Sequence, residues 1–311
     1  MVTILHASDV HFGKPYNASV GEAFQVAAQA VPADLIVVSG DLTQRAKVKE
    51  FRAARAWLDR LPQVPLVITP GNHDVPLFRV LERVFAPYRN YRTYISDQLD
   101  SMTRIPGAIV VSLNSTAPLR AIVNGRIDRR QLAFAAQVFR EADPSDTRII
   151  VAHHHFAPAP DYEDDSVMPR AREVLDALTD MQVELILGGH LHRSHVGNSL
   201  DVYPGADREH GIVIVQSGTT TSHRGRARER AKNSFNVVRI AADHLEITQF
   251  MYFAELGRFA PFSMHAFPRR SSRHFSRDPF QNSILLRQID GEARGEPGPR
   301  EVAGRTPGGL Q

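Results

Sequence analysis

Six short apolar runs, each followed at once by polar residues or glycine, constrain this chain more than any other feature of its sequence. They are VTILHA (2–7), DLIVVSG (34–40), VPLVITPG (64–71), AIVVSLN (108–114), RIIVAH (148–153) and VELILGG (183–189). Their bias towards β-branched residues is typical of strands buried on both faces. Apolar residues recur at helical spacing between them, so the chain is expected to be an α/β protein with helices packed on a sheet.

The pattern changes after Gly211, where IVIVQSG, FNVVRI and HLEITQF follow one another with short connections and period-two alternation. This pattern predicts antiparallel strands that form a second sheet. The sequence contains no repeat and no recognisable linker. We therefore expect one domain over residues 1–268.

Residues 269–311 differ in composition from the rest of the chain. They carry eight Arg against five Asp and Glu, and the last twenty residues are mostly small, polar or charged. We expect a basic, disordered tail and assign it no function. Because the whole chain has a formal net charge of only +3, the domain before the tail is balanced in charge. It offers no basic face, so nucleic acid is not an expected partner.

Several classes of protein are excluded by composition. The chain has no cysteine, which rules out disulfides and thiolate metal sites. No window has the roughly eighteen apolar residues of a membrane span. The first apolar run begins at Val2 and leaves no room for the basic start of a secretory signal, so we expect a cytoplasmic protein.

Side chains that bind metals follow five of the six runs. They are Asp9 and His11 after the first run, Asp41 after the second, Asn72 after the third, His153 to His155 at the end of the fifth, and His190 and His192 after the sixth. Proteins with open α/β sheets bind their substrates and cofactors outside the carboxyl ends of the strands, where all of these residues are expected. Such a set exceeds the needs of one ion, whereas two ions that share a bridging carboxylate would use it fully.

Each motif has an ordinary explanation when it is taken singly. Asp-x-His can be a turn or an ion pair, Gly-Asp is a common turn, and Gly-Asn-His-Asp can cap a helix. A run of histidines can also be an accident of the surface. Five such motifs in order, each just after an apolar run, favour a metal site over these alternatives.

The ordered series DVH, GD, GNHD, H and GHLH resembles the motifs of the calcineurin-like metallophosphoesterase superfamily, over residues 1 to about 250. The resemblance implies a four-layer α/β/β/α sandwich with a dinuclear site. It also implies hydrolysis of phosphoesters by a hydroxide that the two ions make available between them. Mn, Fe, Zn, Co and Ni all suit such a donor set, and a small phosphoester is the implied partner.

The resemblance also implies a role for each ligand. One ion would be held by Asp9, His11 and His192, the other by Asn72, His190 and one histidine of the triplet, and Asp41 would bridge them. The family often places its ligand in a His-His-Pro motif directly after the strand, which favours His153 and leaves His154 beside it. Pro158 comes late in this chain, so His154 remains an alternative ligand.

Three further residues are candidates for contact with substrate or for support of such a residue. By resemblance, His73 would face the scissile phosphate and protonate the leaving oxygen, with Asp74 orienting its ring. In the alternative interpretation, His73 only caps the turn. Arg45 could clamp a phosphate, or it could simply begin the surface helix that follows.

The chain looks most like bacterial class III cyclic-nucleotide and glycerophosphodiester phosphodiesterases. The alternatives are a pyrophosphatase of the UDP-diacylglucosamine type, a nuclease and a non-catalytic scaffold. Residues 76–104, which are rich in aromatic residues and Arg, could cover the metals and select the substrate. They could equally form an amphipathic helix that buries Leu77, Val80, Leu81 and Val84 in the core.

Overall fold

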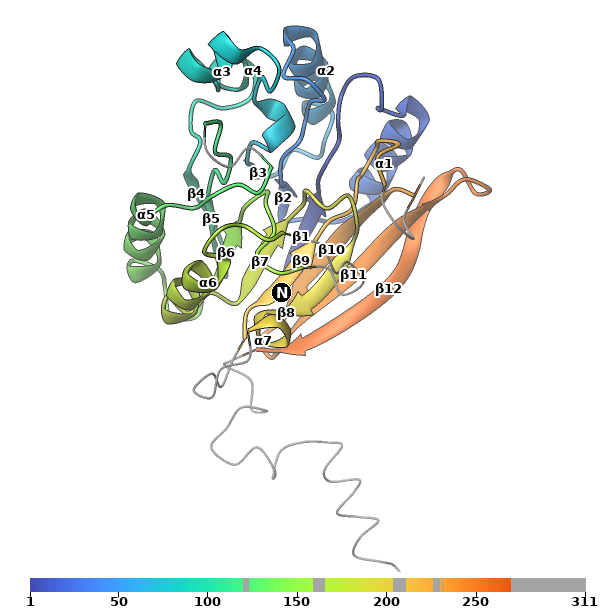
Figure 1. Cartoon of the computed structure of the whole chain (residues 1–311). Helices are drawn as coiled ribbons and strands as arrows, with labels where there is room; N and C mark the ends of the chain where they lie inside the picture. Colours follow the sequence, from blue (N-terminus) through green and yellow to red (C-terminus); the bar gives the residue numbers. More distant parts are fainter. Residues whose placement is uncertain (120–122, 159–165, 204–210, 226–229, 231, 270–311) are drawn as a thin grey trace, which may run out of the picture.

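Two six-stranded sheets form the centre of the molecule (Figure 1). The computed structural model describes residues 1–119, 123–158, 166–203, 211–225, 230 and 232–269. The first sheet has the order β12 (Arg258–Pro268), β11 (His244–Phe253), β10 (Ser234–Ile240), β1 (Val2–Ala7), β2 (Leu35–Val38) and β3 (Leu66–Ile68). The second has the order β4 (Ser101–Ile105), β5 (Ala108–Ser112), β6 (Thr147–Val151), β7 (Leu185–Gly188), β9 (Val213–Gln216) and β8 (His195–Asn198).

Both sheets are mixed. In the first sheet, β1, β2 and β3 run parallel to one another, and β10 pairs antiparallel with β1. In the second sheet, β5, β6, β7 and β9 run parallel, with antiparallel strands at the two edges. The parallel strands of each sheet therefore all end on the same side of the molecule, which lies at the top in Figure 1.

The continuous apolar runs are explained by burial on both faces of each sheet. Ile4 of β1 packs between the two sheets in one cluster with Val37 and Val151. Its neighbour Leu5 points to the opposite face and packs in a cluster with Phe24 of the first helix. Because successive side chains of a strand alternate between faces, strands in this position must be apolar at nearly every residue.

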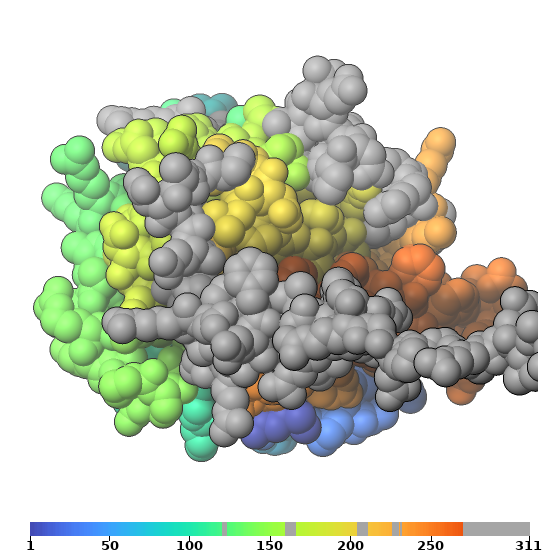
Figure 2. Space-filling model, turned by 90° about the horizontal axis from the view of Figure 1, so that it is seen from below, coloured from blue at the N-terminus to red at the C-terminus, as the bar shows by residue number. Residues whose placement is uncertain are grey.

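Helices form the two outer layers. Residues of α1 (Ala18–Ala30), α2 (Val48–Leu58) and α4 (Arg89–Tyr94) share a cluster with the outer face of the first sheet, and residues of α5 (Arg129–Arg140) and α6 (Ala171–Asp180) with that of the second. Viewed from below, α5 and α6 (green to yellow-green) and β12 (orange) lie on opposite sides of the described surface (Figure 2). The expected four-layer α/β/β/α sandwich is confirmed. The remaining helices are short: η1 (Asn72–Asp74), α3 (Val80–Phe85) and α7 (Ser199–Val202).

The expectation that the strands after Gly211 form a second sheet of their own is wrong. β10 and β11 are antiparallel as predicted, but they extend the sheet that contains β1. β9 joins the other sheet, where it pairs in parallel with β7. Alternation along a strand reports which of its faces is buried, but it does not specify the strand beside which it pairs.

The amphipathic helix expected near residue 80 does not bury its apolar face. No residue of α3 is buried, and Val80, Leu81 and Val84 are all exposed. Leu77 is half-buried. The core interpretation of these residues is therefore wrong, because the first sheet is already covered by α1, α2 and α4.

The boundary at residue 268 stays a prediction. β12 ends at Pro268, and the Arg269 guanidinium donates two hydrogen bonds of 2.9 Å to the carboxylate of Glu184. The expected tail, residues 270–311, lies outside the described residues. Among the helices of the described ranges, none has the length and apolarity needed to cross a membrane.

Candidate metal centre

Five residues at the ends of the central strands adopt left-handed backbone conformations. They are Asp9 (φ 53°), His11 (φ 53°), Asp41 (φ 50°), His190 (φ 74°) and His192 (φ 53°). Only three other non-glycine residues in the described ranges have positive φ. The left-handed region costs a residue with a Cβ about 1–2 kcal/mol. Its concentration at the predicted ligands therefore marks a site where the backbone is held in place for function.

Hydroxyl groups of three residues after β9 hold the loop that follows β1, which contains Asp9 and His11. The Thr219 hydroxyl donates to the Asp9 carbonyl (2.7 Å), and that of Thr221 donates to the Val10 carbonyl (2.9 Å). The Thr220 hydroxyl accepts a bond from the Ser8 amide (3.0 Å). All three threonines are buried. The sequence analysis missed them, although the run TTTS directly after an apolar strand was a usable signal.

Four of the predicted ligands converge on one point. They are Asp9, His11, Asp41 and His192, and one ligand atom of each lies within 4.8 Å of the others. The Nε2 atoms of His11 and His192 are 2.9 Å apart, and Nε2 of His192 is 3.1 Å from Oδ1 of Asp9. Two imidazole nitrogens bound to one ion at about 2.0–2.1 Å would face each other at a similar separation.

A second group of ligands lies next to the first. Oδ1 of Asn72 is 3.2 Å from Nε2 of His153 and 3.0 Å from Nδ1 of His190. Nε2 of His153 is also 3.5 Å from Oδ2 of Asp41, and Oδ2 is 3.7 Å from Nε2 of His11. One carboxylate oxygen of Asp41 therefore faces both groups. All seven predicted ligands lie together at the carboxyl ends of the strands.

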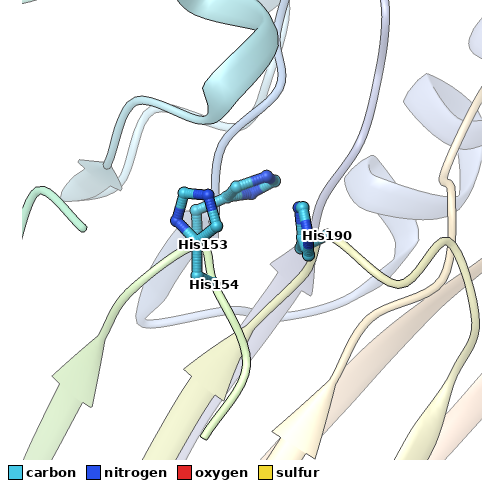
Figure 3. A group of neighbouring side chains, drawn as sticks. All are labelled: His153, His154 and His190. Carbon is cyan, nitrogen blue, oxygen red and sulfur yellow. The ribbon is translucent and has the colours of Figure 1, made fainter. Parts of the chain in front are cut away.

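The two leading histidines of the triplet point in different directions. Nδ1 of His153 donates to the Ser39 carbonyl (2.8 Å), which leaves Nε2 to face Asp41 and Asn72. Nδ1 of His154 bonds instead to the Ser115 hydroxyl (2.8 Å). His153, His154 and His190 form a compact group above the ends of β6 and β7 (Figure 3). His153 is the one that faces Asp41 and Asn72. The ligand atoms of His154 and His190 lie within 4.8 Å of each other and of that of His153, and Nε2 of His154 is buried without a hydrogen-bond partner in the described ranges, so His154 stays an alternative ligand.

Glycine is required where the backbone approaches these side chains. Gly40 has φ +96°, and a Cβ there would lie 2.5 Å from Nδ1 of His153. A Cβ on Gly189 would overlap the Ser8 hydroxyl and lie 2.5 Å from Oδ2 of Asp9. The glycines of the motifs GD and GGH therefore make room for the ligands.

The carboxylates of the site remain ionised although they are buried. Burial alone would raise the pKa of Asp9, but the imidazoles around it, His192 first, hold the pKa well below its usual range. Burial opposes ionisation of Asp41 in the same way, and His153 and His73 lower its pKa. Both side chains therefore carry a negative charge at neutral pH.

Two of the ligand imidazoles, those of His11 and His190, are neutral. Burial lowers the pKa of His11 to about 4 and that of His190 well below its usual range. His153 differs: burial alone would lower its pKa, but the charge of Asp41, 3.5 Å away, raises the pKa to about 9. Ionised carboxylates and neutral imidazoles are the forms that bind metal ions.

The donor set fits divalent cations. Oδ1 of Asp9 and Oδ2 of Asp41 are buried, and neither accepts a hydrogen bond from any residue in the described ranges. A buried carboxylate oxygen without a donor is costly unless a cation neutralises it. The surrounding nitrogen and oxygen donors suit Mn, Fe, Zn, Co or Ni.

Asp74 does not orient the ring of His73 as expected. Its carboxylate accepts hydrogen bonds from the amides of Leu42, Thr43 and Gly71. Nδ1 of His73 instead bonds to the Gln44 carbonyl (3.0 Å). Burial, followed by the charge of Asp41, raises the pKa of Asp74 to about 7. Asp74 joins the loop after β2 to the loop after β3. It can do so because its backbone lies in η1, within reach of the amides that follow β2.

Two further residues at the edge of the site were missed by the sequence analysis. The side-chain oxygen of Gln44 accepts a bond from the Arg224 guanidinium (2.9 Å), and the Arg224 carbonyl accepts one from Nδ1 of His192 (3.0 Å). Both residues follow strands, which was the available signal. Arg45 lies with its guanidinium carbon 4.2 Å from the centroid of the Phe78 ring. The phosphate contact and the surface role of Arg45 both remain predictions.

Comparison with known proteins agrees with this geometry. Residues 2–194 match the family of calcineurin-like phosphoesterases. Over 176 residues the chain is 27% identical to a probable cyclic nucleotide phosphodiesterase of Synechococcus sp., and the match covers 55% of this chain and 63% of that protein.

Two solved structures have a similar fold. One is a purple acid phosphatase from yellow lupin, Lupinus luteus (TM-score 0.62, 14% identity, 86% of this chain and 54% of that chain). The other is a dimetal phosphatase from Danio rerio (TM-score 0.60, 13% identity, 86% of this chain and 99% of that chain). At these identities the likeness concerns the fold alone.

The close approach at Gly40 generates a testable prediction. Gly40→Ala should lower metal content and displace His153, in addition to a backbone penalty of about 1–2 kcal/mol in the free energy of unfolding. Gly107→Ala is the matched control, because Gly107 also has positive φ (+85°) but a Cβ there would meet only Val2, at 3.4 Å. Urea unfolding and elemental analysis after reconstitution with Mn would separate the two effects. Equal metal content in both variants would contradict the proposed contact.

Proposed function

The chain belongs to the family of calcineurin-like phosphoesterases, and we propose that it is a phosphodiesterase for small diesters such as cyclic nucleotides or glycerophosphodiesters. The family identifies it as a metal-dependent phosphoester hydrolase. The likeness to the Synechococcus protein favours a cyclic nucleotide within that class. Since the match covers 63% of that protein, the substrate is a proposal.

One observation carries the proposal: Oδ2 of Asp41 lies between the two groups of ligands. It is 3.7 Å from Nε2 of His11 and 3.5 Å from Nε2 of His153, and no hydrogen-bond donor of the described residues satisfies it. A carboxylate oxygen in this position is suited to bridge two cations.

The ligands divide into two sets in this proposal. Asp9, His11 and His192 would hold one ion, Asn72, His153 and His190 would hold the other, and Asp41 would bridge them. Two divalent ions bound there would neutralise the phosphoryl oxygens and supply an acidified water near neutral pH. Asn72 is neutral, so it adds a ligand without adding negative charge that would weaken this acidity.

Neighbouring carbonyls fix the tautomers of the imidazole ligands. Nδ1 of His153 donates to the Ser39 carbonyl, and Nδ1 of His192 donates to the Arg224 carbonyl. In its neutral form each ring would therefore present the lone pair of Nε2 to the site, and at His153 an incoming cation would displace the Nε2 proton. Removal of either carbonyl contact would let the ring turn away without changing the ligand itself.

In this proposal His73 acts on the leaving group. Its Nδ1 atom bonds to the Gln44 carbonyl, and its ring packs edge-to-face with that of His11 at 5.0 Å between centroids. With Nδ1 occupied by that carbonyl, a protonated His73 carries its second proton on Nε2. This proton can be donated to the leaving oxygen of the diester.

Asp41→Ala should abolish hydrolysis of bis(p-nitrophenyl) phosphate and remove at least one metal per chain, because both ligand groups lose their shared oxygen. Asp59→Ala is a suitable control, since Asp59 is an exposed aspartate that pairs with Arg55 on α2. Elemental analysis and the rate of hydrolysis are the measurements. An Asp41→Ala enzyme with full activity would rule out the bridging role.

His73→Ala should keep its metals and lose rate chiefly on diesters with poor leaving groups. The loss should be about 10²–10⁴-fold there, and smaller for p-nitrophenolate, which leaves without a proton. His73→Gln, which keeps a polar side chain but cannot carry the charge, should behave like the alanine variant. The same loss on all leaving groups would show that His73 only shapes the turn.

The substrate class can be tested with metal-free protein reconstituted with Mn. We expect metal-dependent hydrolysis of bis(p-nitrophenyl) phosphate and cyclic AMP, and weaker hydrolysis of p-nitrophenyl phosphate. Hydrolysis of a UDP-linked diphosphate alone would replace the proposal with a pyrophosphatase. Two bound metals without turnover of any of these substrates would point to a non-catalytic scaffold.

A further inference from the structure

Five exposed apolar side chains lie within eight consecutive residues at and before α3. They are Phe78 (72% exposed), Val80 (56%), Leu81 (75%), Val84 (43%) and Phe85 (81%), and we call them the α3 apolar face. The described residues contain fourteen exposed large apolar side chains in all, so this short segment holds more than a third of them. Such a concentration on a soluble surface usually marks a site of interaction.

The spacing of these residues gives them a common direction. Leu81 and Phe85 lie four residues apart in α3, as do Val80 and Val84, so each pair shares one side of the helix. Phe78 precedes the helix and is exposed beside it. α3 contributes no buried residue to the domain. Its apolar side therefore points outward, where contact with water is unfavourable for each large side chain.

The charge around this face is positive. Residues 78–94 contain four arginines (Arg79, Arg83, Arg89 and Arg92) and a single acidic residue, Glu82. Arg89 and Arg92 of α4 are exposed and lie three residues apart, on one side of that helix. Apolar side chains flanked by arginines are the pattern of helices that lie in the interface of an anionic membrane.

Direct hydrogen bonds join this segment to the loop that begins at Asp41. The Arg79 guanidinium donates to the carbonyls of Arg45 and Ala46, each at 2.9 Å. The Asn90 side chain of α4 also donates to the Ala46 carbonyl (2.9 Å). α3 and α4 lie on the side of the molecule where the central strands end (Figure 1). The α3 apolar face is therefore fixed beside the candidate metal centre.

We propose that the α3 apolar face docks on an anionic phospholipid bilayer. Leu81, Phe85 and their neighbours would enter the boundary between headgroups and acyl chains, while the exposed Arg89 and Arg92 bind lipid phosphates. A symmetric contact with a second copy fits less well, because it would bring the arginines around the face of one copy against the same arginines of the other. The proposal does not depend on the proposed function, although docking would bring the metal centre close to phosphoesters carried by lipids.

Sedimentation of the full chain with vesicles tests the docking. We expect binding to phosphatidylcholine vesicles that contain phosphatidylglycerol, and much weaker binding to phosphatidylcholine alone. Leu81→Ser combined with Phe85→Ser should weaken partitioning by at least about tenfold, given the apolar area lost. Val26→Ser combined with Met264→Ser is the matched control, because these side chains are 72% and 66% exposed but lie elsewhere.

Charge is tested separately with Arg89→Gln combined with Arg92→Gln, which should reduce the preference for anionic vesicles about tenfold. Hydrolysis of a soluble diester without vesicles should be unchanged in the Leu81/Phe85 variant, so a failure of docking is distinguishable from a failure of the proposed function. Absence of vesicle binding, or equal binding by the Leu81/Phe85 variant and the Val26/Met264 control, would overturn the proposal. So would a wild-type dimer that the Leu81/Phe85 variant converts to a monomer, because the face would then contact a second copy.

Discussion

Hydrogen bonds between loops hold the left-handed backbone at the candidate metal centre, and the rest of the site depends on them. The amide of His11 donates to the Asp41 carbonyl (2.9 Å), so the loop after β1 is aligned on the loop after β2. Asp74 ties the loop after β2 to the loop after β3 through the amides of Leu42, Thr43 and Gly71. The hydroxyls of Thr219 to Thr221 close the arrangement from β9. A strained conformation persists only when its surroundings specify it in this way.

This network also accounts for what the sequence could and could not predict. The strand ends carry the candidate ligands in contiguous motifs, so the grouping of Asp9, Asp41 and His190 could be predicted without a structure. Asp74 lies within such a motif, but its partners are amides of another loop, and no sequence pattern reports where a side chain finds backbone donors. The threonines after β9 act in the same way, through contacts more than two hundred residues away in the chain.

The fold was predictable to a similar depth. Apolar runs revealed six central strands because burial on both faces leaves a direct mark on composition. The assignment of β9 and β10 to different sheets left no such mark, since both strands are buried. A helix near residue 80 was one of two interpretations of residues 76–104, and periodicity identifies an apolar side without indicating what covers it.

Left-handed aspartate and histidine residues set up a conflict between activity and folding. Glycine or asparagine at Asp9, His11, Asp41, His190 and His192 would relax the backbone and remove buried charge or unsatisfied nitrogen. A copy of this chain released from selection for metal binding would therefore gain stability by drifting at these five positions first. Loss of activity would make such a protein more stable. Substitutions in these motifs in a relative would therefore indicate that catalysis was lost while the fold was kept.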